Sequence, residues 1–518
     1  MASPPSMNLK KSFATCLNRF LSGQYSTRRK DCSITKKSGV GLVKPLVVDL
    51  DGTLIKTDLL FETVNRFITL YPFRIFQLVV WLFAGRIDLK TRLANAVEID
   101  AASLPYNDAL VEWLRQQKAK GRPLILATAS HRKLAELVAR HLDLFDEVLA
   151  TEGENNLKAQ RKRDLLVSRF GEGGFDYVGN DRADLPVWQS AQRAYVISSS
   201  RSLIARATVQ GNVEQVWDKV KPPFVGILFK AMRPHQWMKN LLVFVPLLAA
   251  HHYGDEAGVL LALAAFFVFG LTASSVYLLN DLVDINDDRH HQRKRQRPFA
   301  SGNLSILHGW LVWPVLLLIG FAISILILPV KFSAVLVVYF ILTLAYSLQL
   351  KKRALVDVLT LAALYTLRII AGAAVVSVPL SFWLATFSMF IFLSLAFIKR
   401  FSELKLARDS GRNENLRGRG YRSEDIEMVS AMGVASGYLS VLVLALYIQD
   451  SHTAILYHTP EFIWLACPLL LYWISRAWLI AHRGEMHDDP IVFALTDRKS
   501  WLVVAGFLIC FALARVVK

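Results

Sequence analysis

A group of carboxylates stands where a long apolar run ends, and its spacing suits a chemical role. Residues 260–279 form the run, and Asn280, Asp281, Asp284 and Asp288, here called the acid motif, follow it. In a continuing helix, residues 280, 284 and 288 share one face. Carboxylates at a membrane margin cost free energy unless they are paired or bind a metal. Clustered oxygens suit Mg²⁺ that bridges to a diphosphate, so the motif predicts a metal site.

The chain turns strongly basic directly after these acids. Arg289, Arg293, Lys294, Arg295 and Arg297 lie within nine positions. Their side chains could bind the phosphate oxygens of a diphosphate, and Lys294 and Arg297 are the candidates for substrate binding. The same residues could instead fix which side of a membrane the loop occupies. Both interpretations account for the basic residues, and both are kept.

A second pair of carboxylates follows a short apolar segment near the amino terminus. The sequence LVVDLDGTL predicts a buried strand that ends at Asp49 and Asp51. Side chains two residues apart on a strand project to the same side. One carboxylate can therefore attack phosphorus while the other handles the proton of the leaving group. Gly52 and Thr53 suit a tight turn whose backbone amides can bind a phosphate.

This segment resembles the first motif of the haloacid dehalogenase-like superfamily, and later segments match the other motifs in order. The resemblance implies that Asp49 is the nucleophile and Asp51 the acid/base at a Mg²⁺ site. The second motif is matched by PLILATAS, in which Thr128 would hold the phosphoryl group. The third is matched by AQRKRDLL, which offers Lys162, with Lys158 as a rival, to neutralise the phosphate.

The fourth motif is matched by FDYVGNDRADLPVW, another strand that ends at acidic residues. The resemblance implies that Asp184 belongs to the Mg²⁺ site. Asn180 stands where the family usually has an aspartate, and its amide oxygen can coordinate Mg²⁺ without supplying negative charge. Asp181 could compensate only from a different direction on the backbone. An active phosphatase and a degenerate or regulatory domain therefore both remain open.

Residues 58–105 lie between the first two motifs and are expected to form a helical cap. They include the apolar sequence FITLYPFRIFQLVVWLFAGR, which Pro72 and Arg74 interrupt. Its uninterrupted apolar part is too short to cross a bilayer. A helix buried within the cap and a segment that lies on the membrane surface both fit this pattern.

The chain of 518 residues divides near residue 225, and beyond that point long apolar runs alternate with short charged loops. Runs of about 18 or more apolar residues are typical of transmembrane helices. We count nine runs, centred near residues 244, 268, 318, 341, 365, 390, 439, 471 and 508. The predicted parts are a basic tail, a phosphatase-like domain, a linker and a membrane domain, over residues 1–44, 45–215, 216–235 and 236–518.

The net charge of +18 does not indicate nucleic-acid binding, because most basic residues beyond 225 lie in short loops. The even-numbered loops between the apolar runs carry 19 Lys and Arg, whereas the odd-numbered loops carry 1. By the positive-inside rule, the even loops and the amino-terminal domain lie on the cytoplasmic side. The four cysteines show neither metal-ligand spacing nor a disulfide framework.

The acid motif also carries a family resemblance. NDxxDxxxD followed by RPxASG resembles the first signature of the UbiA superfamily of intramembrane prenyltransferases. The resemblance covers about residues 225–518 and implies nine helices with an active site that faces the cytoplasm. It implies that Asp281 and Asp284 are central to catalysis, and that with Asn280 and Asp288 they hold Mg²⁺ on the diphosphate of the donor.

A second signature narrows the branch. Arg368 falls well inside an apolar run, where a charge costs about 2.5–3.5 kcal/mol, so it should face a polar cavity. Aromatic prenyltransferases of the superfamily usually carry a second motif, DxxxD, where this chain has KRFSEL. This replacement resembles the decaprenyl-phosphate phosphoribosyltransferase branch. The residues offered for substrate binding are Tyr346, Lys351, Asp357, Arg368, Lys399, Arg400 and Glu403.

The resemblance implies transfer of phosphoribose from phosphoribosyl pyrophosphate to a polyprenyl phosphate, with Mg²⁺ stabilising the departing diphosphate. Two phosphorylated substrates need more cation than one, which fits Lys399 and Arg400 in place of the second acidic motif. The fused phosphatase-like domain could then remove the 5-phosphate from the product. A prenyltransferase that joins a polyprenyl diphosphate to an aromatic acceptor is the alternative enzyme. A transporter or scaffold with an inactive soluble domain is the non-enzymatic alternative.

Together the resemblances predict a two-domain fold, with an α/β Rossmann-like domain that bears a helical cap, followed by an all-α membrane bundle of nine helices. The expected partners are Mg²⁺, a polyprenyl phosphate or diphosphate lipid, phosphoribosyl pyrophosphate and the lipid bilayer, without nucleic acid. The expected location is the inner (cytoplasmic) membrane of a bacterium, with both active sites facing the cytoplasm.

Overall fold

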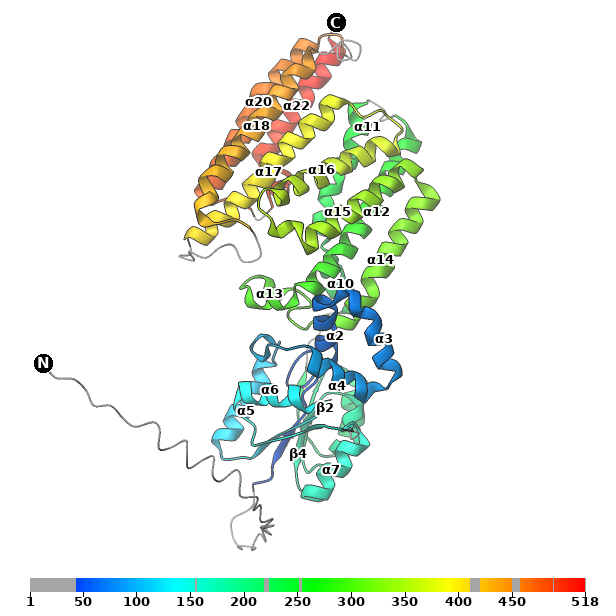
Figure 1. The fold of residues 1–518 in the computed structure, drawn as a ribbon, viewed down its shortest axis with the longest axis vertical. Helices are drawn as coiled ribbons and strands as arrows, with labels where there is room; N and C mark the ends of the chain where they lie inside the picture. The colour runs from blue at the N-terminus through cyan, green and yellow to red at the C-terminus, as the bar shows by residue number, and fades with distance from the viewer. Residues whose placement is uncertain are drawn as a thin grey trace, which may run out of the picture. The chain divides into compact units, whose positions relative to one another are not determined.

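The described chain begins with an α/β region and continues as a bundle of long apolar helices (Figure 1). Residues Lys44–Lys518 form one compact unit that contains both regions. The basic tail predicted for residues 1–44 lies outside the described residues, except for its last two. The computed structural model describes residues 43–153, 156–218, 223–250, 254–409, 420–449, 457–487 and 489–517.

Among the described residues, six strands form one sheet in the order β3-β2-β1-β4-β5-β6, and every neighbouring pair is parallel. The chain builds one side of β1 first and then the other, so the strand order reverses at β1. The parallel sheet expected for the amino-terminal region is confirmed. Its strands are β1 (Leu46–Val48), β2 (Leu124–His131), β3 (Glu147–Thr151), β4 (Asp176–Gly179), β5 (Ala194–Ser198) and β6 (Val213–Asp218).

Strand β1 is central because its side chains are apolar on both faces. Leu46, Val47 and Val48 are all fully buried, as expected for a parallel strand covered by helices on both sides. Leu46 and Val48 pack with one layer of helices, whereas Val47 packs with the other. The first layer contains α5 (Asp108–Ala119) and α6 (Arg132–Leu142), and the second contains α7 (Gln160–Phe170), α8 (Leu185–Ser190) and α9 (Arg201–Thr208).

The region expected to form a cap is helical. Its helices are α2 (Leu59–Leu70), α3 (Ile75–Phe83) and α4 (Arg86–Ala96). Asp58 caps α2 by accepting a hydrogen bond from the amide of Leu60 at 2.8 Å. Phe67 of α2 and Leu93 of α4 are buried together, but no residue of α3 is buried.

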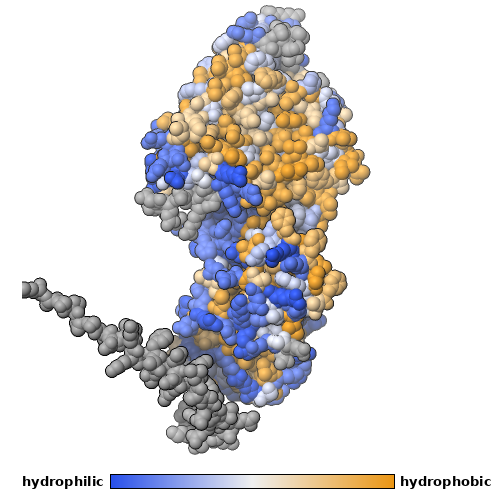
Figure 2. Space-filling view, viewed as in Figure 1, coloured by the Kyte–Doolittle hydropathy of each residue, from blue (hydrophilic) through white to orange (hydrophobic). Residues whose placement is uncertain are grey.

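Eight helices in the described part of the chain are long and apolar enough to cross a membrane. Apolar side chains cover most of the surface visible over them in Figure 2. The protein is therefore an integral membrane protein. The helices are α12 (Glu256–Val283), α14 (Ile306–Ile327), α15 (Val330–Leu348), α16 (Val356–Val375), α17 (Phe382–Asp409), α18 (Ile426–Ile448), α20 (Ala466–Arg483) and α22 (Arg498–Val516).

The first of the nine expected spans is not one continuous α-helix. It consists of the 3₁₀ helix η4 (Pro234–Phe244) and the short α11 (Val245–Ala249). Upstream, α10 (Phe224–Met232) is followed by Arg233, whose φ of 55° is left-handed. Proline favours the start of a helix and cannot donate a backbone hydrogen bond, so Pro234 and Pro246 break this segment into pieces. The expected count of nine spans is not confirmed.

The broken segment lies very close to α16, and a glycine makes this possible. A Cβ atom added at Gly372 would lie 2.1 Å from the carbonyl oxygen of Val243 in η4. We expect Gly372→Ala to destabilise the protein by about 1–3 kcal/mol, because backbone cannot move aside as a side chain can. The decrease should appear as a lower Tm in detergent.

Gly226→Ala is the matched control for this prediction. A Cβ atom at Gly226 in α10 would meet nothing nearer than 3.7 Å. Alanine is the better helix former, so this variant should keep or slightly raise the Tm. Equal Tm values for the two variants would contradict the close approach of η4 to α16.

Candidate functional sites

The carboxyl ends of β1, β2 and β4 meet at one edge of the sheet, where the strand order reverses. Asp49 and Asp51 follow β1, Thr128 lies near the end of β2, and Asp184 follows β4. A reversal of this kind is the usual ligand site of an open parallel sheet. The residues predicted from the four amino-terminal motifs therefore gather in one place.

Lys162 lies at the centre of this site, whereas Lys158 is exposed. Lys162 Nζ donates to Asp49 Oδ1 at 2.6 Å and to the hydroxyl of Tyr177 at 2.9 Å. It also lies 3.8 Å from Asp184 Oδ1. Of the two lysines offered by the sequence, Lys162 is the one that contacts Asp49.

Burial changes the protonation of the two aspartates after β1. It raises the pKa of Asp49 to about 7, although the Lys162 ammonium opposes the shift. It raises the pKa of Asp51 to about 6, against hydrogen bonds from Leu59 N at 2.8 Å and Ser130 Oγ at 2.7 Å. A carboxyl that titrates near neutrality can both give and accept a proton, which suits an acid/base.

The fourth motif contributes backbone as well as side-chain contacts. Asp184 Oδ2 accepts hydrogen bonds from the amides of Asn180 and Asp181, each at 3.0 Å, and so shapes the turn after β4. The Thr53 hydroxyl lies 2.9 Å from Asn180 Oδ1 and 3.3 Å from Asp49 Oδ2, and it brings these two oxygens together. Asp181 is exposed and bonds instead to the amide of Arg182.

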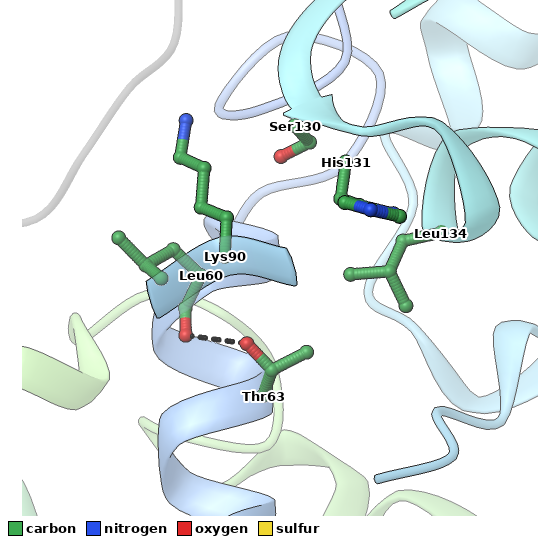
Figure 3. Close-up of a pocket in the computed structure, with 6 residues that line it drawn as sticks. All are labelled: Leu60, Thr63, Lys90, Ser130, His131 and Leu134. Atoms are coloured by element: carbon green, nitrogen blue, oxygen red, sulfur yellow. Dashed lines mark hydrogen bonds between the residues drawn. The ribbon is translucent and has the colours of Figure 1, made fainter. Parts of the chain in front are cut away.

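A small pocket lies beside Asp51, between the cap helices and the end of β2 (Figure 3). Lys90 Nζ donates to the backbone oxygen of Ala129 at 2.6 Å. Burial lowers the pKa of Lys90 and of His131. Both shifts favour the neutral forms of these two side chains. The residues that line it are Leu60, Thr63, Lys90, Ser130, His131 and Leu134.

Sequence reasoning missed the four polar residues of this pocket, Thr63, Lys90, Ser130 and His131. Ser130 and His131 follow Thr128 within three positions, so their place after the second motif was a usable signal. Lys90 comes from α4, and no local pattern connects it with the other motifs. Only the folding of the cap over the sheet edge brings it to the pocket.

In the membrane region, each carboxylate of the acid motif is paired with a cation. Asp281 bonds to Arg233 and, at 3.2 Å, to Arg297 Nη1. The same Arg297 nitrogen lies 2.6 Å from Asp288 Oδ2, and Lys351 Nζ lies 2.8 Å from Asp284 Oδ2. The remaining residue of the motif, Asn280, donates from Nδ2 to Ser347 Oγ at 2.8 Å.

The helix that carries the acid motif is interrupted at Asp284. α12 ends at Val283, and α13 (Ile285–His290) follows. The amide of Asp284 still bonds to Asn280 O and that of Asp288 to Asp284 O, each at 2.8 Å, so the helical spacing expected from the sequence is kept. Burial raises the pKa of Asp288 to about 6, against the neighbouring Arg297.

The acid motif and the site at the carboxyl end of β1 both offer oxygen atoms of the kind that binds Mg²⁺. Asp281 Oδ2 is buried, and it has no hydrogen-bond partner among the described residues. Asp49 and Asn180 offer two more oxygens, joined through the Thr53 hydroxyl. Carboxylate and amide oxygens are ligands that Mg²⁺ prefers. Within the described ranges, no group of three or more His, Cys, Asp or Glu side chains is arranged to hold a metal ion.

Arg400 of the KRFSEL segment is fully buried in α17. Its Nη2 donates to the Tyr346 hydroxyl at 3.0 Å, and its other guanidinium nitrogens donate to Asp357 and Glu403. The Tyr421 hydroxyl donates to Asp357 Oδ1 at 2.6 Å. The four residues predicted here therefore form one closed network, and Arg400 directs all its guanidinium nitrogens to protein partners.

Arg368 lies in the interior of the bundle, also with its charge satisfied. Its guanidinium donates to Asn240 Oδ1 at 3.0 Å, to Leu364 O at 2.5 Å and to the Tyr339 hydroxyl at 2.8 Å. The ring of Tyr339 also lies 4.8 Å from the guanidinium carbon. Arg368 therefore has the polar surroundings expected for a charge inside an apolar run, and polar groups of the protein supply them.

Sequence reasoning missed Arg233, Lys239 and Asp489. Lys239 and Asp489 form a buried ion pair, and Asp489 also caps α21 (Pro490–Thr496). This gives residues 484–500, whose role was not predicted, a contact with η4. The usable signal was a lysine and an arginine close to the first apolar run. Lys399 is half-buried, and Lys294 is exposed.

Helix α2 of the α/β region contacts the acid-motif region through buried polar side chains. Glu62 of α2 and Arg289 form a two-pronged ion pair of 2.6 and 3.2 Å, and each side chain is 4% exposed. Asn65 Nδ2 donates to Leu282 O at 2.8 Å, and Trp310 Nε1 donates to Asn65 Oδ1 at 3.0 Å. α2 therefore packs directly against the end of α12.

Comparisons with known proteins agree with the motifs. Residues 240–515 match the UbiA prenyltransferase family, and residues 46–165 match the haloacid dehalogenase-like hydrolases. An uncharacterized protein, y4nM, of Sinorhizobium fredii is 35% identical over 99% of this chain and 99% of its own. Both resemblances inferred from the sequence are confirmed.

Two further relatives each match 56% of this chain. Nodulation protein NoeC of Azorhizobium caulinodans is 39% identical over 56% of this chain and 94% of its own. Decaprenyl-phosphate phosphoribosyltransferase of Mycobacterium tuberculosis is 31% identical over 56% of this chain and 97% of its own. A solved UbiA homolog from Archaeoglobus fulgidus, bound to GPP and Mg²⁺, has 16% identity and a TM-score of 0.41 over 55% of this chain and 99% of that one.

The buried ion pair between Glu62 and Arg289 should be worth far more than a surface pair. We expect Glu62→Ala to destabilise the protein by about 3–5 kcal/mol, because it leaves a buried guanidinium unpaired. Replacing both residues with leucine and methionine should restore much of the loss. Thermal unfolding in detergent measures both effects.

Glu136→Ala, in helix α6 of the α/β region, is the control for Glu62→Ala. Glu136 pairs with Arg140 on the surface, where the two side chains are 35% and 80% exposed. Its loss should cost less than about 1 kcal/mol. If both alanine variants unfold at the same temperature, the Glu62–Arg289 pair stabilises the protein no more than a surface ion pair does.

Proposed function

This chain belongs to the UbiA prenyltransferase family, and on that premise we propose that its membrane region transfers phosphoribose from phosphoribosyl pyrophosphate to a polyprenyl phosphate. The protein is a transferase with a fused haloacid dehalogenase-like domain. Its product would be a polyprenyl-phosphoribose that carries a 5-phosphate. The 31% identity to a decaprenyl-phosphate phosphoribosyltransferase supports this substrate class.

The observation that carries the proposal is the pairing of the acid motif with Arg233, Arg297 and Lys351. Mg²⁺ would bring positive charge for the carboxylates, and the diphosphate would bring negative charge for the cations. The complex could therefore replace both partners of each ion pair. The metal would be held by Asp281, Asp284 and Asp288, with Asn280 beside them, and the cations released from these carboxylates would bind phosphate oxygens. The site can therefore accept the complex without leaving a buried charge unpaired.

The transfer step follows from this arrangement. An oxygen of the lipid phosphate attacks the anomeric carbon of phosphoribosyl pyrophosphate, and the bond from that carbon to the diphosphate breaks. The diphosphate leaves with the electron pair, and Arg297 and Lys351 stabilise its charge. When bound, Mg²⁺ supplies further stabilisation of the leaving group.

Two neighbouring cations in α17 take different parts in this proposal. The guanidinium of Arg400 bonds to Tyr346, Asp357 and Glu403, so we assign it to positioning these side chains. Lys399 is half-buried, and we assign it to the phosphate of the second substrate.

We place the protein in the inner membrane, with both sites facing the cytoplasm. The support is the excess of Lys and Arg in the even loops, 19 against 1. Phosphoribosyl pyrophosphate is charged and water-soluble, so a site at the cytoplasmic end of the spans would give it access without passage through the bilayer.

For the haloacid dehalogenase-like domain, we propose hydrolysis of the 5-phosphate left on the transferred sugar. The support is the position of Asp49 beside Lys162 and the hydrogen bond that Ser130, which lines the pocket, donates to Asp51. Asp49 attacks the phosphorus, the bond to the sugar oxygen breaks, and Asp51 protonates that oxygen. Water then attacks the phosphoaspartyl group, releases phosphate and restores Asp49. Fusion of the domains raises the local concentration of the intermediate.

Transfer is tested with labelled phosphoribosyl pyrophosphate, Mg²⁺ and polyprenyl phosphate. The purified protein should yield a labelled lipid, and Asp284→Asn should lower the rate at least about 100-fold, roughly 2.7 kcal/mol. Asp287→Asn should keep the rate, because Asp287 is exposed in the same segment. No labelled lipid, together with prenylation of an aromatic acid, would overturn the proposed transfer.

The second reaction is tested with Asp49→Asn in the same assay. This variant should keep the transferase rate and accumulate the 5-phosphorylated lipid, because it lacks the nucleophile. Asp181→Asn is the control, since Asp181 is an exposed acid of the same domain. An identical product from the unaltered protein and from Asp49→Asn would mean that the domain does not act on this lipid.

A further inference from the structure

Helix α3 presents apolar side chains in several directions. It has nine residues, IFQLVVWLF, and none of them is buried. Phe73, just before the helix, is 96% exposed, Phe76 is 76% exposed and Phe83 is 88% exposed. Val80 adds to this surface with 65% exposure. Soluble proteins rarely expose so much contiguous apolar surface without a partner.

The contacts of α3 show that its exposed side chains are not part of the cap core. Phe67 of α2 and Leu93 of α4 are buried in one cluster. α3 contributes Leu78 and Trp81 to this cluster, and both are only partly buried. A helix buried within the cap, one of the two interpretations of the sequence, is therefore wrong.

The position of α2 indicates lipid as the partner of α3. Together, α2 and α3 are apolar enough to cross a membrane, but the chain bends by 116° between them. α2 itself packs against α12 and α14, through the hydrogen bonds of Asn65 to Leu282 and Trp310. The bend therefore starts beside the same end of the membrane helices (Figure 1).

The charges around α3 also suit a membrane surface. Residues 72–87 contain Arg74 and Arg86 but no acidic residue. Arginine next to an apolar helix can bind anionic lipid headgroups while the apolar side chains enter the leaflet. Figure 2 shows apolar side chains gathered over α3, close to the apolar surface of the membrane helices.

We propose that α3 is an interfacial membrane helix, which inserts its exposed phenylalanines into the lipid leaflet at the acid-motif end of the spans. Nine residues extend about 14 Å, too short to cross a hydrocarbon core of about 30 Å. The helix therefore lies in the interface and anchors the haloacid dehalogenase-like domain to the bilayer.

Anchoring has a consequence for substrate access, which rests on the phosphatase role proposed above. α3 joins α2 and α4, and both neighbours line the pocket beside Asp51 through Leu60, Thr63 and Lys90. Insertion of α3 holds this pocket at the membrane surface. The phosphate of a membrane lipid can then reach Asp51 and Asp49 while the lipid chain stays in the bilayer.

Insertion is tested on the full chain in vesicles that contain phosphatidylglycerol. In a background with the four natural cysteines replaced by alanine, single cysteines at Phe76, Phe83 and Val209 receive a polarity-sensitive fluorophore. Val209 is the control, because it is 87% exposed at the end of α9. Labels at Phe76 and Phe83 should shift to the blue and be quenched by nitroxides on lipid acyl chains, while the Val209 label responds only to aqueous iodide.

Two outcomes would overturn the proposal. Labels on α3 that iodide quenches as strongly as the Val209 label would mean that the helix lies in water. Labels that neither quencher reaches, together with cross-linking between copies, would mean that a second copy of the chain covers the helix.

An activity measurement tests the consequence separately. Phe76→Ser combined with Phe83→Ser should slow dephosphorylation of the lipid product at least tenfold, yet leave hydrolysis of p-nitrophenyl phosphate unchanged. Val209→Ser should change neither rate. Equal loss on both substrates would contradict a role in access to lipid. No hydrolysis of either substrate by the unaltered protein would instead contradict the proposed phosphatase, and insertion would still be decided by the fluorescence.

Discussion

The carboxylates of the acid motif lie where apolar helices end, and Arg233, Arg297 and Lys351 pair with them. An unpaired carboxylate in such surroundings costs several kcal/mol, so these cations are a condition for the fold. They come from three separate parts of the chain. Arg233 stands at the left-handed turn before η4, Arg297 follows η5 (Lys294–Gln296), and Lys351 lies after α15. Charge pairing thus fixes the loops that surround the site.

The same constraint acts at the edge of the parallel sheet. Asp49 is buried beside Asp51 and Asp184, and Lys162 is the cation that makes this arrangement tolerable. A phosphate bound there would bring its negative charge next to the Lys162 ammonium. The replacement of an acid by Asn180 removes one negative charge from the group, while its amide oxygen stays close to Asp49 through the Thr53 hydroxyl. The loss of a charge is therefore compatible with an ordered site.

The sequence predicted the parts of both sites that belong to local patterns. The resemblance to the haloacid dehalogenase-like motifs assigned Asp49 and Thr128 to one site, and helical spacing placed Asn280, Asp284 and Asp288 on one face. The sequence favoured Lys162 but kept Lys158 as a rival, because the choice depends on how α7 packs on the sheet. Arg233 and Lys239 were missed, since they flank or enter a segment interpreted as a continuous span. That segment is broken at Pro234 and Pro246, and its polar groups turn toward α16 and Asp489.

Helix α2 connects the two sites physically. Its first amide, from Leu59, donates to Asp51 Oδ1, and Glu62 in its first turn pairs with Arg289 directly after the acid motif. Moving α2 away from the spans would break a buried ion pair, at a cost of about 3–5 kcal/mol. Leu60 and Thr63 of α2 also line the pocket beside Asp51, so this wall of the pocket is fixed to the membrane helices.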